Sequence, residues 1–321
     1  MSSVKGIGAI VAEPGMTVGM FAAILLPVFA STNFASAEDV DPMQLPIGKK
    51  GTIQAPVGSI TDTSNGSAVT PDQIAARADG KHFVFLGENH ATKEHQQLEA
   101  DVVTALQKRG RKVLVGLEML TRPVQPALDR FIDGTTDEAT FLVESDWKKQ
   151  WGYDYAFYRP LLDAARSQKS TVVALNVPRD WVRSVGKGGL DALTPQQRSQ
   201  LPSVIEVGAG RHRDVFEALM GGHPPSGADR MLAAQTLWDE GMADTAIKAL
   251  GSAINDPNVV MVIVAGSGHV MYGQGINLRI ARRTGRRGIN VVMGQAPSRT
   301  TVSAGLADFV YITTPADKGP K

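Results

Sequence analysis

Five short, continuous hydrophobic runs recur along the chain, separated by stretches whose apolar residues follow helical spacing. Continuous apolarity, rather than alternation, predicts strands that are covered on both faces, as in a parallel sheet. Strand and helix in alternation predict an α/β fold, with a mostly parallel β-sheet flanked by helices. The five runs are KHFVFLG (81–87), KVLVGLEM (112–119), STVVALNV (170–177), NVVMVIVAGSGH (258–269) and INVVMG (289–294).

The segments between these runs predict the crossover helices. In residues 92–110, Leu98, Val102 and Leu106 recur at helical spacing, and Gly110 marks the stop. The stretches YAFYRPLLDAARSQ and GINLRIARRTG show similar spacing. A last apolar stretch, DFVYITT, is expected to add an edge strand.

The regular succession breaks between Pro178 and Asp256, where the pattern predicts helices and loops with no clear strand. Residues 38–80 are rich in Gly, Ser, Thr and Pro, and predict an extended lead-in with room for one short strand and a helix near Pro71–Ala78. The predicted organisation is a signal peptide at 1–37, a polar lead-in segment at 38–80, an α/β core at 81–188 and 256–321, and an all-helical insertion at 189–255.

An apolar run at 18–30, VGMFAAILLPVFA, has the length of a signal peptide's hydrophobic region and is too short to span a bilayer. The small residues of ASA, at 35–37, offer a cleavage site, after which the mature chain begins at Glu38. Lys5 is the one basic residue ahead of the run. We therefore expect export to the periplasm, with an uncleaved N-terminal anchor as the alternative.

Composition narrows the chemistry. The chain has no cysteine, which excludes disulfides, thiolate metal sites, iron–sulfur clusters, a cysteine nucleophile and the acylated cysteine of a lipoprotein. The formal net charge of +1 gives no electrostatic case for binding nucleic acid or an anionic membrane. The sequence also lacks GxSxG, P-loop, HExxH and complete GxGxxG motifs, so the common hydrolase and nucleotide-binding signatures do not apply.

Polar residues follow the predicted strands at the point where each strand ends. Glu88 and His90 close the first run, Glu118 the second and Asn176 the third, while the fourth ends in GSGH with His269. The carboxyl ends of parallel strands share one edge of an open sheet, and ligands bind there. We therefore expect these side chains to converge from distant parts of the sequence.

Carboxylates and imidazoles at one edge suit two kinds of site. As ligands they favour zinc, iron or manganese, and as acid–base pairs they transfer protons. Each residue taken alone also fits a cap or a turn, so both hypotheses depend on convergence. The four residues that both hypotheses use are Glu88, His90, Glu118 and His269.

Several blocks resemble the haem-binding uptake proteins of the ChaN type, in the wider Tiki/erythromycin-esterase superfamily. Between about residues 84 and 295 they are LGENH, GLEM, YRPLLDAAR, VVALNVPR, AQTLWDEGMA and VVMVIVAGSGHVMYGQGI. The resemblance implies an exported bacterial protein of iron or haem uptake, with a parallel-sheet core, a helical subdomain and haem as its cofactor. It also implies a face-to-face haem pair in a homodimer, and an outer-membrane or periplasmic haem transport component as partner.

The superfamily also contains hydrolases with Gly-x-x-His motifs and glutamates, which GENH, GSGH, Glu88 and Glu118 match. The alternative function is therefore a metal-dependent hydrolase in which Glu88, His90, Glu118 and His269 are catalytic, with a divalent metal held by the same four residues. A catalytically inactive scaffold is a third interpretation.

The residues that contact haem remain open at the level of sequence. The best-known relative holds the iron through a tyrosine, whereas residues 189–251 contain no Tyr. Tyr, His and Met all serve as haem ligands. The candidates for the iron ligand are His212, His223, Met220, Met231, Tyr153, Tyr155, Tyr158 and Tyr272. The predicted cofactor-binding residues are Asn176, Arg179, Met231, Trp238, Met242 and Tyr272.

Two further stretches leave alternatives. A helical stripe suits either core packing or a wall against a porphyrin face, and consists of Met231, Gln235, Trp238 and Met242. Asp239 and Glu240, next to this stripe, are expected in solvent. The arginines of RIARRTGRR, at 279–287, suit a solvated face or a clamp on haem propionates.

Overall fold

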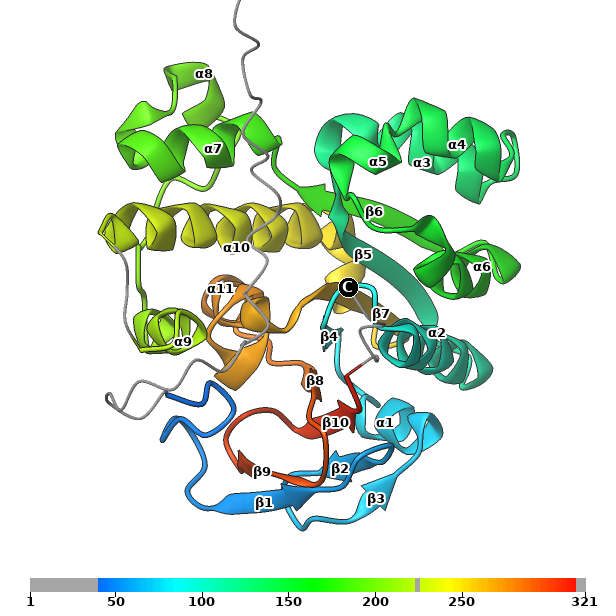
Figure 1. The fold of residues 1–321 in the computed structure, drawn as a ribbon. Helices are drawn as coiled ribbons and strands as arrows, with labels where there is room; N and C mark the ends of the chain where they lie inside the picture. The colour runs from blue at the N-terminus through cyan, green and yellow to red at the C-terminus, as the bar shows by residue number, and fades with distance from the viewer. Residues whose placement is uncertain (1–39, 223–225, 316–321) are drawn as a thin grey trace, which may run out of the picture. The chain divides into compact units, whose positions relative to one another are not determined.

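The computed structural model describes residues 40–222 and 226–315, which belong to one compact unit. The expected signal peptide lies outside the described residues. Within them, eight strands form a sheet of order β3-β2-β10-β8-β4-β7-β5-β6, and β1 pairs with β9 (Figure 1). The strands are β1 (Thr52–Ala55), β2 (Ile60–Asp62), β3 (Ala68–Val69), β4 (Phe83–Glu88), β5 (Lys112–Thr121), β6 (Thr171–Asn176), β7 (Val259–Gly266), β8 (Ile289–Gln295), β9 (Thr300–Ser303) and β10 (Phe309–Thr313).

Helices connect and cover these strands. The α-helices are α1 (Pro71–Arg77), α2 (Lys93–Lys108), α3 (Gln125–Ile132), α4 (Glu138–Glu144), α5 (Trp147–Gln150), α6 (Arg159–Ser167), α7 (Arg179–Gly188), α8 (Pro195–Arg198), α9 (His212–Leu219), α10 (Ala228–Leu250) and α11 (Ile276–Thr284). Short 3₁₀ turns lie between them, of which η5 (Ser267–His269) directly follows β7. No helix in the described ranges is long and apolar enough to cross a membrane.

The core of the sheet is parallel. Neighbouring strands from β10 through β8, β4, β7 and β5 to β6 pair in parallel, whereas β2 pairs antiparallel with β10 and with β3. The predicted class, an α/β fold with a mostly parallel sheet flanked by helices, is confirmed. The five predicted strands are β4 to β8.

Two expectations about the margins of the sheet are wrong. The stretch DFVYITT forms β10, which lies inside the sheet between β2 and β8 and is not an edge strand. The lead-in holds three strands, β1, β2 and β3, and β2 and β3 extend the main sheet. The pairing of β2 with β10 joins segments near opposite ends of the chain, so local patterns carry no signal for it.

Alternate residues of each continuous apolar run point to opposite faces of the sheet. In β4, Val84 and Leu86 pack in a cluster with α1, α2 and α6, while Phe83 and Phe85 pack in a second cluster with α10 and α11. Successive side chains of a strand point to opposite faces, so one run serves both layers. Figure 1 shows these two helix groups on either side of the sheet.

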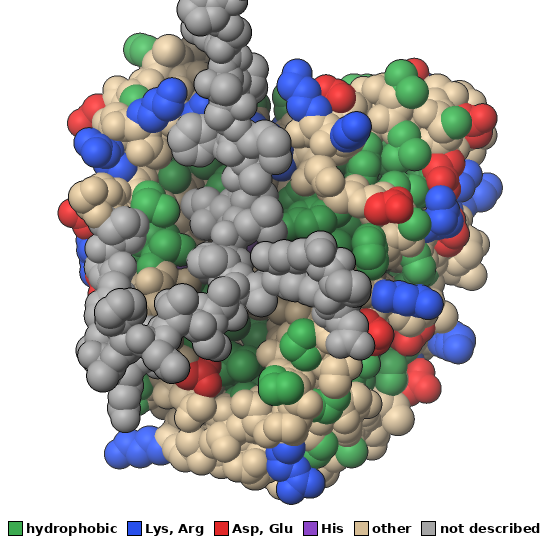
Figure 2. Space-filling model, in the orientation of Figure 1, with side chains coloured by type: hydrophobic (Ala, Val, Ile, Leu, Met, Phe, Trp, Pro, Cys, Tyr) green, Lys and Arg blue, Asp and Glu red, His purple; other side chains and the backbone are tan. Residues whose placement is uncertain are grey.

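The described residues of the insertion are helices and loops, and α7 and α10 pack together in a third apolar cluster around Leu237 and Val185. Charged side chains of both signs are interspersed over the face shown in Figure 2. That distribution agrees with the net charge of +1 and shows no extended region of one sign on this face.

The contact between α10 and the β6–α7 connection is tight at Gly241. A Cβ atom at this position would lie 2.4 Å from Cγ1 of Val177. We predict that Gly241→Ala lowers the free energy of unfolding by about 1–3 kcal/mol, because such overpacking forces neighbouring groups to move. Urea denaturation followed by circular dichroism measures this change.

Gly186, in α7, provides the matched helical control. The nearest atom that a Cβ there would meet is Cβ of Ala234, at 3.8 Å, which is an ordinary contact. Since alanine favours a helix over glycine by about 1 kcal/mol, Gly186→Ala should leave stability unchanged or raise it. Equal destabilisation by both substitutions would contradict the packing described here.

Candidate functional site

The strand-end residues approach the carboxyl edge of the sheet from opposite faces. Glu88 ends β4 on the side of α2, where Gln96 and Tyr158 donate hydrogen bonds to its carboxylate. Glu118 lies in β5, and its Oε1 is 3.4 Å from Nε2 of His269. Strand β7 runs between β4 and β5, so its end separates the two carboxylates.

The first pair is Glu88 with His90. Nδ1 of His90 lies 2.6 Å from Oε1 of Glu88, and Tyr158 donates to the same oxygen at 3.1 Å. The Glu88 side chain is almost fully buried, while that of His90 is 24% exposed. Among the described residues, Nε2 of His90 has no hydrogen-bond partner. The carboxylate therefore fixes the ring and leaves one nitrogen accessible.

The second group is Glu118, His269 and Asp239. Nδ1 of His269 lies 2.6 Å from Oδ1 of Asp239, which comes from α10 in the insertion. Oε2 of Glu118 accepts a hydrogen bond of 2.6 Å from the backbone N–H of Gly266. His269 therefore has a carboxylate facing each ring nitrogen.

Gly266 allows the two groups to approach each other. A Cβ atom at this position would lie 3.0 Å from Cε1 and 3.1 Å from Nε2 of His90, and 3.7 Å from Oε2 of Glu118. The ring of His90 therefore occupies space that any other residue at the end of β7 would fill. Gly266, the first residue of the GSGH motif, therefore has a packing role.

Electrostatics separate the roles of the two histidines. Burial opposes the charged form of His269, but the charges and hydrogen bonds of Glu118 and Asp239 raise its pKa to about 10. In return, although burial acts in the opposite direction, His269 and then His90 lower the pKa of Glu118 to about 2. His269 is thus an imidazolium at neutral pH, and both of its nitrogens carry protons.

The pKa of His90 is also raised. Burial alone would lower it, and the hydrogen bond and charge of Glu88, with the charge of Glu118, outweigh that effect. Burial would raise the pKa of Glu88, but His90, with hydrogen bonds from Glu99 and Gln96, lowers it. Glu88 is therefore a carboxylate whose charge favours a proton on His90.

Aromatic rings flank both histidines. The ring of Trp151 meets that of His90 edge-on at 4.6 Å between centroids, and Tyr153 lies 5.7 Å from His90. Trp238, from α10, lies 6.1 Å from His269. We call Trp151 and Tyr153 the aromatic wall of the site.

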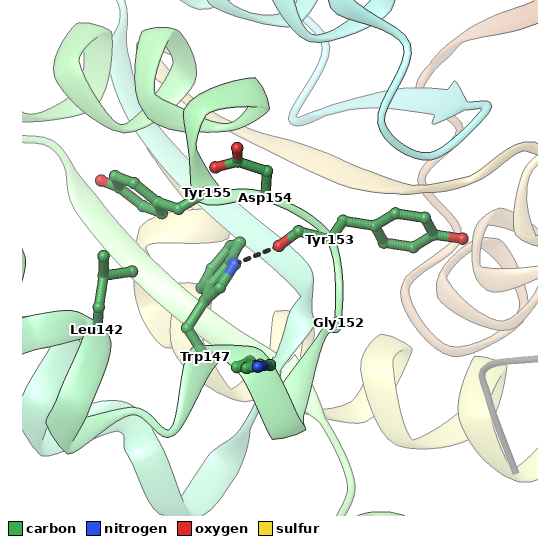
Figure 3. Close-up of a pocket in the computed structure, with 7 residues that line it drawn as sticks. Leu142, Trp147, Gly152, Tyr153, Asp154 and Tyr155 are labelled. Carbon is green, nitrogen blue, oxygen red and sulfur yellow. Dashed lines mark hydrogen bonds between the residues drawn. The ribbon is translucent and has the colours of Figure 1, made fainter. Parts of the chain in front are cut away.

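A pocket of about 360 Å³ lies behind this wall, lined by Leu142, Trp147, Lys148, Gly152, Tyr153, Asp154 and Tyr155 (Figure 3). The ring of Tyr153 points away from it, while the backbone oxygen of Tyr153 accepts a hydrogen bond of 2.8 Å from Nε1 of Trp147 (Figure 3). This bond holds the backbone while the ring extends toward His90.

The other predicted cofactor-binding residues differ in their contacts and in their burial. Nδ2 of Asn176 donates to the backbone oxygen of Glu118 at 3.1 Å, which ties β6 to β5. Met242 is fully buried in the α10 cluster, while Met231 and Trp238 are partly exposed. The hydroxyl of Tyr272 is occupied by the lead-in, donating to the backbone oxygen of Pro42 at 2.9 Å.

Several candidates for the iron ligand have no accessible atom. Both ring nitrogens of His212 are engaged, Nδ1 by Arg279 at 3.0 Å and Nε2 by Asp239 at 3.1 Å. The hydroxyl of Tyr158 is bound to Glu88, and Tyr155 is buried among aromatic rings. His223 lies outside the described residues. Tyr153, Met220 and Met231 remain partly exposed.

The expectation that Asp239 and Glu240 lie in solvent is wrong. Asp239 has no exposed surface and Glu240 is 5% exposed. Burial opposes ionisation of Asp239, but Arg279, His269 and His212 together lower its pKa. Two arginines of 279–287 pair with Glu240, namely Arg279 and Arg283, whereas Arg282 pairs with Glu206.

Sequence reasoning also missed the contribution of α2. Gln96 and Glu99 are fully buried next to Glu88. Burial, followed by the charge of Glu88, raises the pKa of Glu99 well above its usual value, so Glu99 carries a proton. The spacing of Gln96 and Glu99 with Ala100 and Val103, on the buried face of α2, was the available signal.

Comparisons with known proteins agree with this fold. The family described as "Haem-binding uptake, Tiki superfamily, ChaN" matches residues 74–280, more than half of the chain. The chain belongs to this haem-binding uptake family. A solved structure described as "Cofacial heme binding to ChaN of Campylobacter jejuni" is 19% identical, covers 78% of this chain and 95% of its own, and has a TM-score of 0.60. No curated protein matches the chain.

More distant solved structures also align. An erythromycin esterase mutant in its open conformation is 14% identical and covers 78% of this chain and 83% of its own, with a TM-score of 0.43. The RRSP effector domain of a Vibrio vulnificus toxin is 17% identical and covers 81% of this chain and 42% of its own, with a TM-score of 0.42. The TM-score of 0.60 shows that ChaN of Campylobacter jejuni and this chain share a fold.

The residues at the carboxyl edge of the sheet, which we call the rim of the site, fit haem, the ligand of the ChaN family. Haem needs an axial ligand, apolar walls and partners for its carboxylates. His90 presents an accessible nitrogen, and Trp151 and Tyr153 supply an aromatic surface beside it. A divalent metal has less support, since the described ranges contain no group of three or more His, Cys, Asp or Glu side chains placed to hold one.

The charge on His269 predicts a pH dependence of stability. The folded pKa, about 10, lies above the ordinary value of about 6.5, so the stabilisation is fully present below pH 6.5 and is lost as pH rises through about 10. We predict that the free energy of unfolding falls from about pH 7 to pH 10, and that His269→Gln reduces this slope. Urea denaturation at stepwise pH measures both.

His95 provides a control of opposite sign. Burial lowers its pKa to about 4, so its stabilisation is present above about pH 6.5 and is lost as pH falls toward 4. His95→Gln should therefore leave the alkaline slope unchanged. An alkaline slope that persists undiminished in His269→Gln would refute the assignment.

Proposed function

We propose that the chain binds haem at the carboxyl edge of the sheet and that His90 provides the iron ligand. The observation that carries this proposal is the Glu88–His90 pair, in which a buried carboxylate holds Nδ1 at 2.6 Å and leaves Nε2 accessible. Histidine ligands of metals generally donate their second N–H to such a carboxylate, which orients the ring and strengthens the ligand. Membership of the haem-binding uptake family supports haem as the cargo.

Other features of the rim support binding of a large flat ligand. Trp151 and Tyr153 stand beside His90, and Trp238 stands beside His269. Aromatic rings bury large apolar areas and stack on other π-systems. His269 cannot ligate iron while both of its nitrogens are protonated. Its role in this proposal is therefore a fixed positive charge beside the bound haem.

Hydrolysis is the second candidate, because the same geometry suits proton transfer. Nε2 of His90 could take a proton from water, with Glu88 stabilising the imidazolium, and the charged His269 could stabilise an oxyanion. The two candidates share His90 but differ in what they need from the aromatic wall. Haem binding depends on it, whereas hydrolysis of a small ester does not.

Hemin titration separates the candidates. We predict a saturable Soret shift in the purified protein, and a decrease of at least about tenfold in hemin affinity in His90→Ala, since an iron–ligand bond is removed. His82→Ala is the matched control, because His82 lies at the opposite end of the same strand and bonds the backbone oxygen of Val259 at 3.2 Å. It should retain both affinity and spectrum.

Two outcomes would contradict the assignment of His90. If Tyr153→Phe abolishes the Soret shift and His90→Ala preserves it, the ligand is the tyrosine. If hemin binds without saturation while the protein cleaves small esters in a His90-dependent manner, hydrolysis is the function. Matched circular dichroism spectra of the variants show that each one folds.

We also propose export to the periplasm, on the basis of the apolar run 18–30 and the small residues at 35–37. Homodimer formation and hand-over of haem to a transport component are further proposals, supported by family membership. In a Gram-negative expression host, the periplasmic fraction should contain a chain whose N-terminal sequence begins at Glu38. Recovery of the full-length chain from the cytoplasm alone would contradict export.

A further inference from the structure

Arg179 lies at the rim of the site without a carboxylate partner among the described residues. It is the first residue of α7 and follows β6 at its carboxyl end. Its Nη1 donates to the backbone oxygen of Lys149 in α5 at 3.0 Å. The residue is partly buried, and burial lowers the pKa of its guanidinium while the charge of Glu118 acts in the opposite direction.

Other arginines near the insertion form ion pairs with carboxylates. Arg122 lies 3.7 Å from Asp244, and Arg279 lies 3.4 Å from Asp239. A partly buried charge that lacks a partner loses hydration without compensation. The guanidinium of Arg179, with one hydrogen bond to a neutral oxygen, therefore has donors left for an anion.

The position of Arg179 connects it to the aromatic wall. Lys149, its hydrogen-bond partner, precedes Trp151 by two residues, and the ring of Trp151 meets His90 at 4.6 Å. Arg183 lies four residues further along α7, on the same side of the helix, and is exposed. Its positive charge also lowers the pKa of Arg179, so the two guanidinium groups influence each other electrostatically.

We propose that Arg179 and Arg183 form a carboxylate subsite that takes the propionate edge of the bound haem. Arginine matches carboxylates with two parallel hydrogen bonds, and two arginines suit the two propionates of one haem. The subsite selects ligands that carry free carboxylates and fixes the orientation of the macrocycle against the aromatic wall. This inference rests on the proposed haem-binding function.

Esterification of the ligand provides the test. Wild-type protein should bind hemin about tenfold more tightly than hemin dimethyl ester, which retains the iron and the ring but lacks both negative charges. In Arg179→Gln the affinity for hemin should fall to that for the ester, while the affinity for the ester stays unchanged. Arg179→Lys keeps the charge and loses the two-pronged geometry, so it should fall between the two.

Arg299→Gln is the matched control, since Arg299 is exposed near β9 and remote in sequence from the site. It should preserve the full preference for hemin. Arg183→Gln should lose part of the preference.

The outcomes separate this inference from the function on which it rests. Equal, saturable binding of hemin and its ester by wild-type protein overturns the carboxylate subsite and leaves haem binding intact. Loss of both ligands in Arg179→Gln shows a purely structural role and also overturns it. If wild-type protein binds neither ligand, the proposed function itself fails.

Discussion

The ion pairs of His269 with Asp239 and Glu118 are the interaction on which the site depends. A buried charge is tolerated only with a partner, and removal of one member leaves the others uncompensated. Asp239 belongs to α10, Glu118 to β5 and His269 to the turn after β7. Arg279 and His212 add α11 and α9 to the same junction. The helical insertion is therefore joined to the sheet by paired charges, in addition to apolar packing.

Much of the fold follows from local pattern. Each of the strands β4 to β8 appears in the sequence as a continuous apolar run. Alternate residues of a strand point to opposite faces of the sheet, and both faces are covered by helices. The order of strands does not follow in this way. Strand β10 enters the sheet between β2 and β8, and the lead-in supplies β2 itself. Such pairing depends on contacts between segments that are distant in sequence, which the composition of either segment does not specify.

The site shows the same division. Glu88, His90, Glu118 and His269 stand out in the sequence as polar residues at the ends of apolar runs, and the parallel sheet brings them to one edge. The end predicted at Glu118 is early, because β5 continues to Thr121. The polar dipeptide of Asp239 and Glu240, directly after Trp238, predicts carboxylates in solvent. Helical spacing contained the opposite signal, since Asp239 lies four residues after Gln235 and three before Met242, on the stripe already identified. A charged residue at such a helical position indicates a partner, and here the partner is His269.

The two histidines show how surroundings assign different chemistry to one residue type. His269 faces two carboxylates and is fixed as a cation, so it has no lone pair to give. His90 faces one carboxylate through Nδ1, and its other nitrogen remains accessible beside Trp151. A metal or a proton must therefore compete for Nε2 of His90 alone, with the charge of Glu88 favouring either cation. Gly266 leaves open the space that the His90 ring occupies, because a Cβ atom there would lie 3.0 Å from Cε1 of this ring, and the accessible nitrogen therefore depends on a glycine at the end of β7.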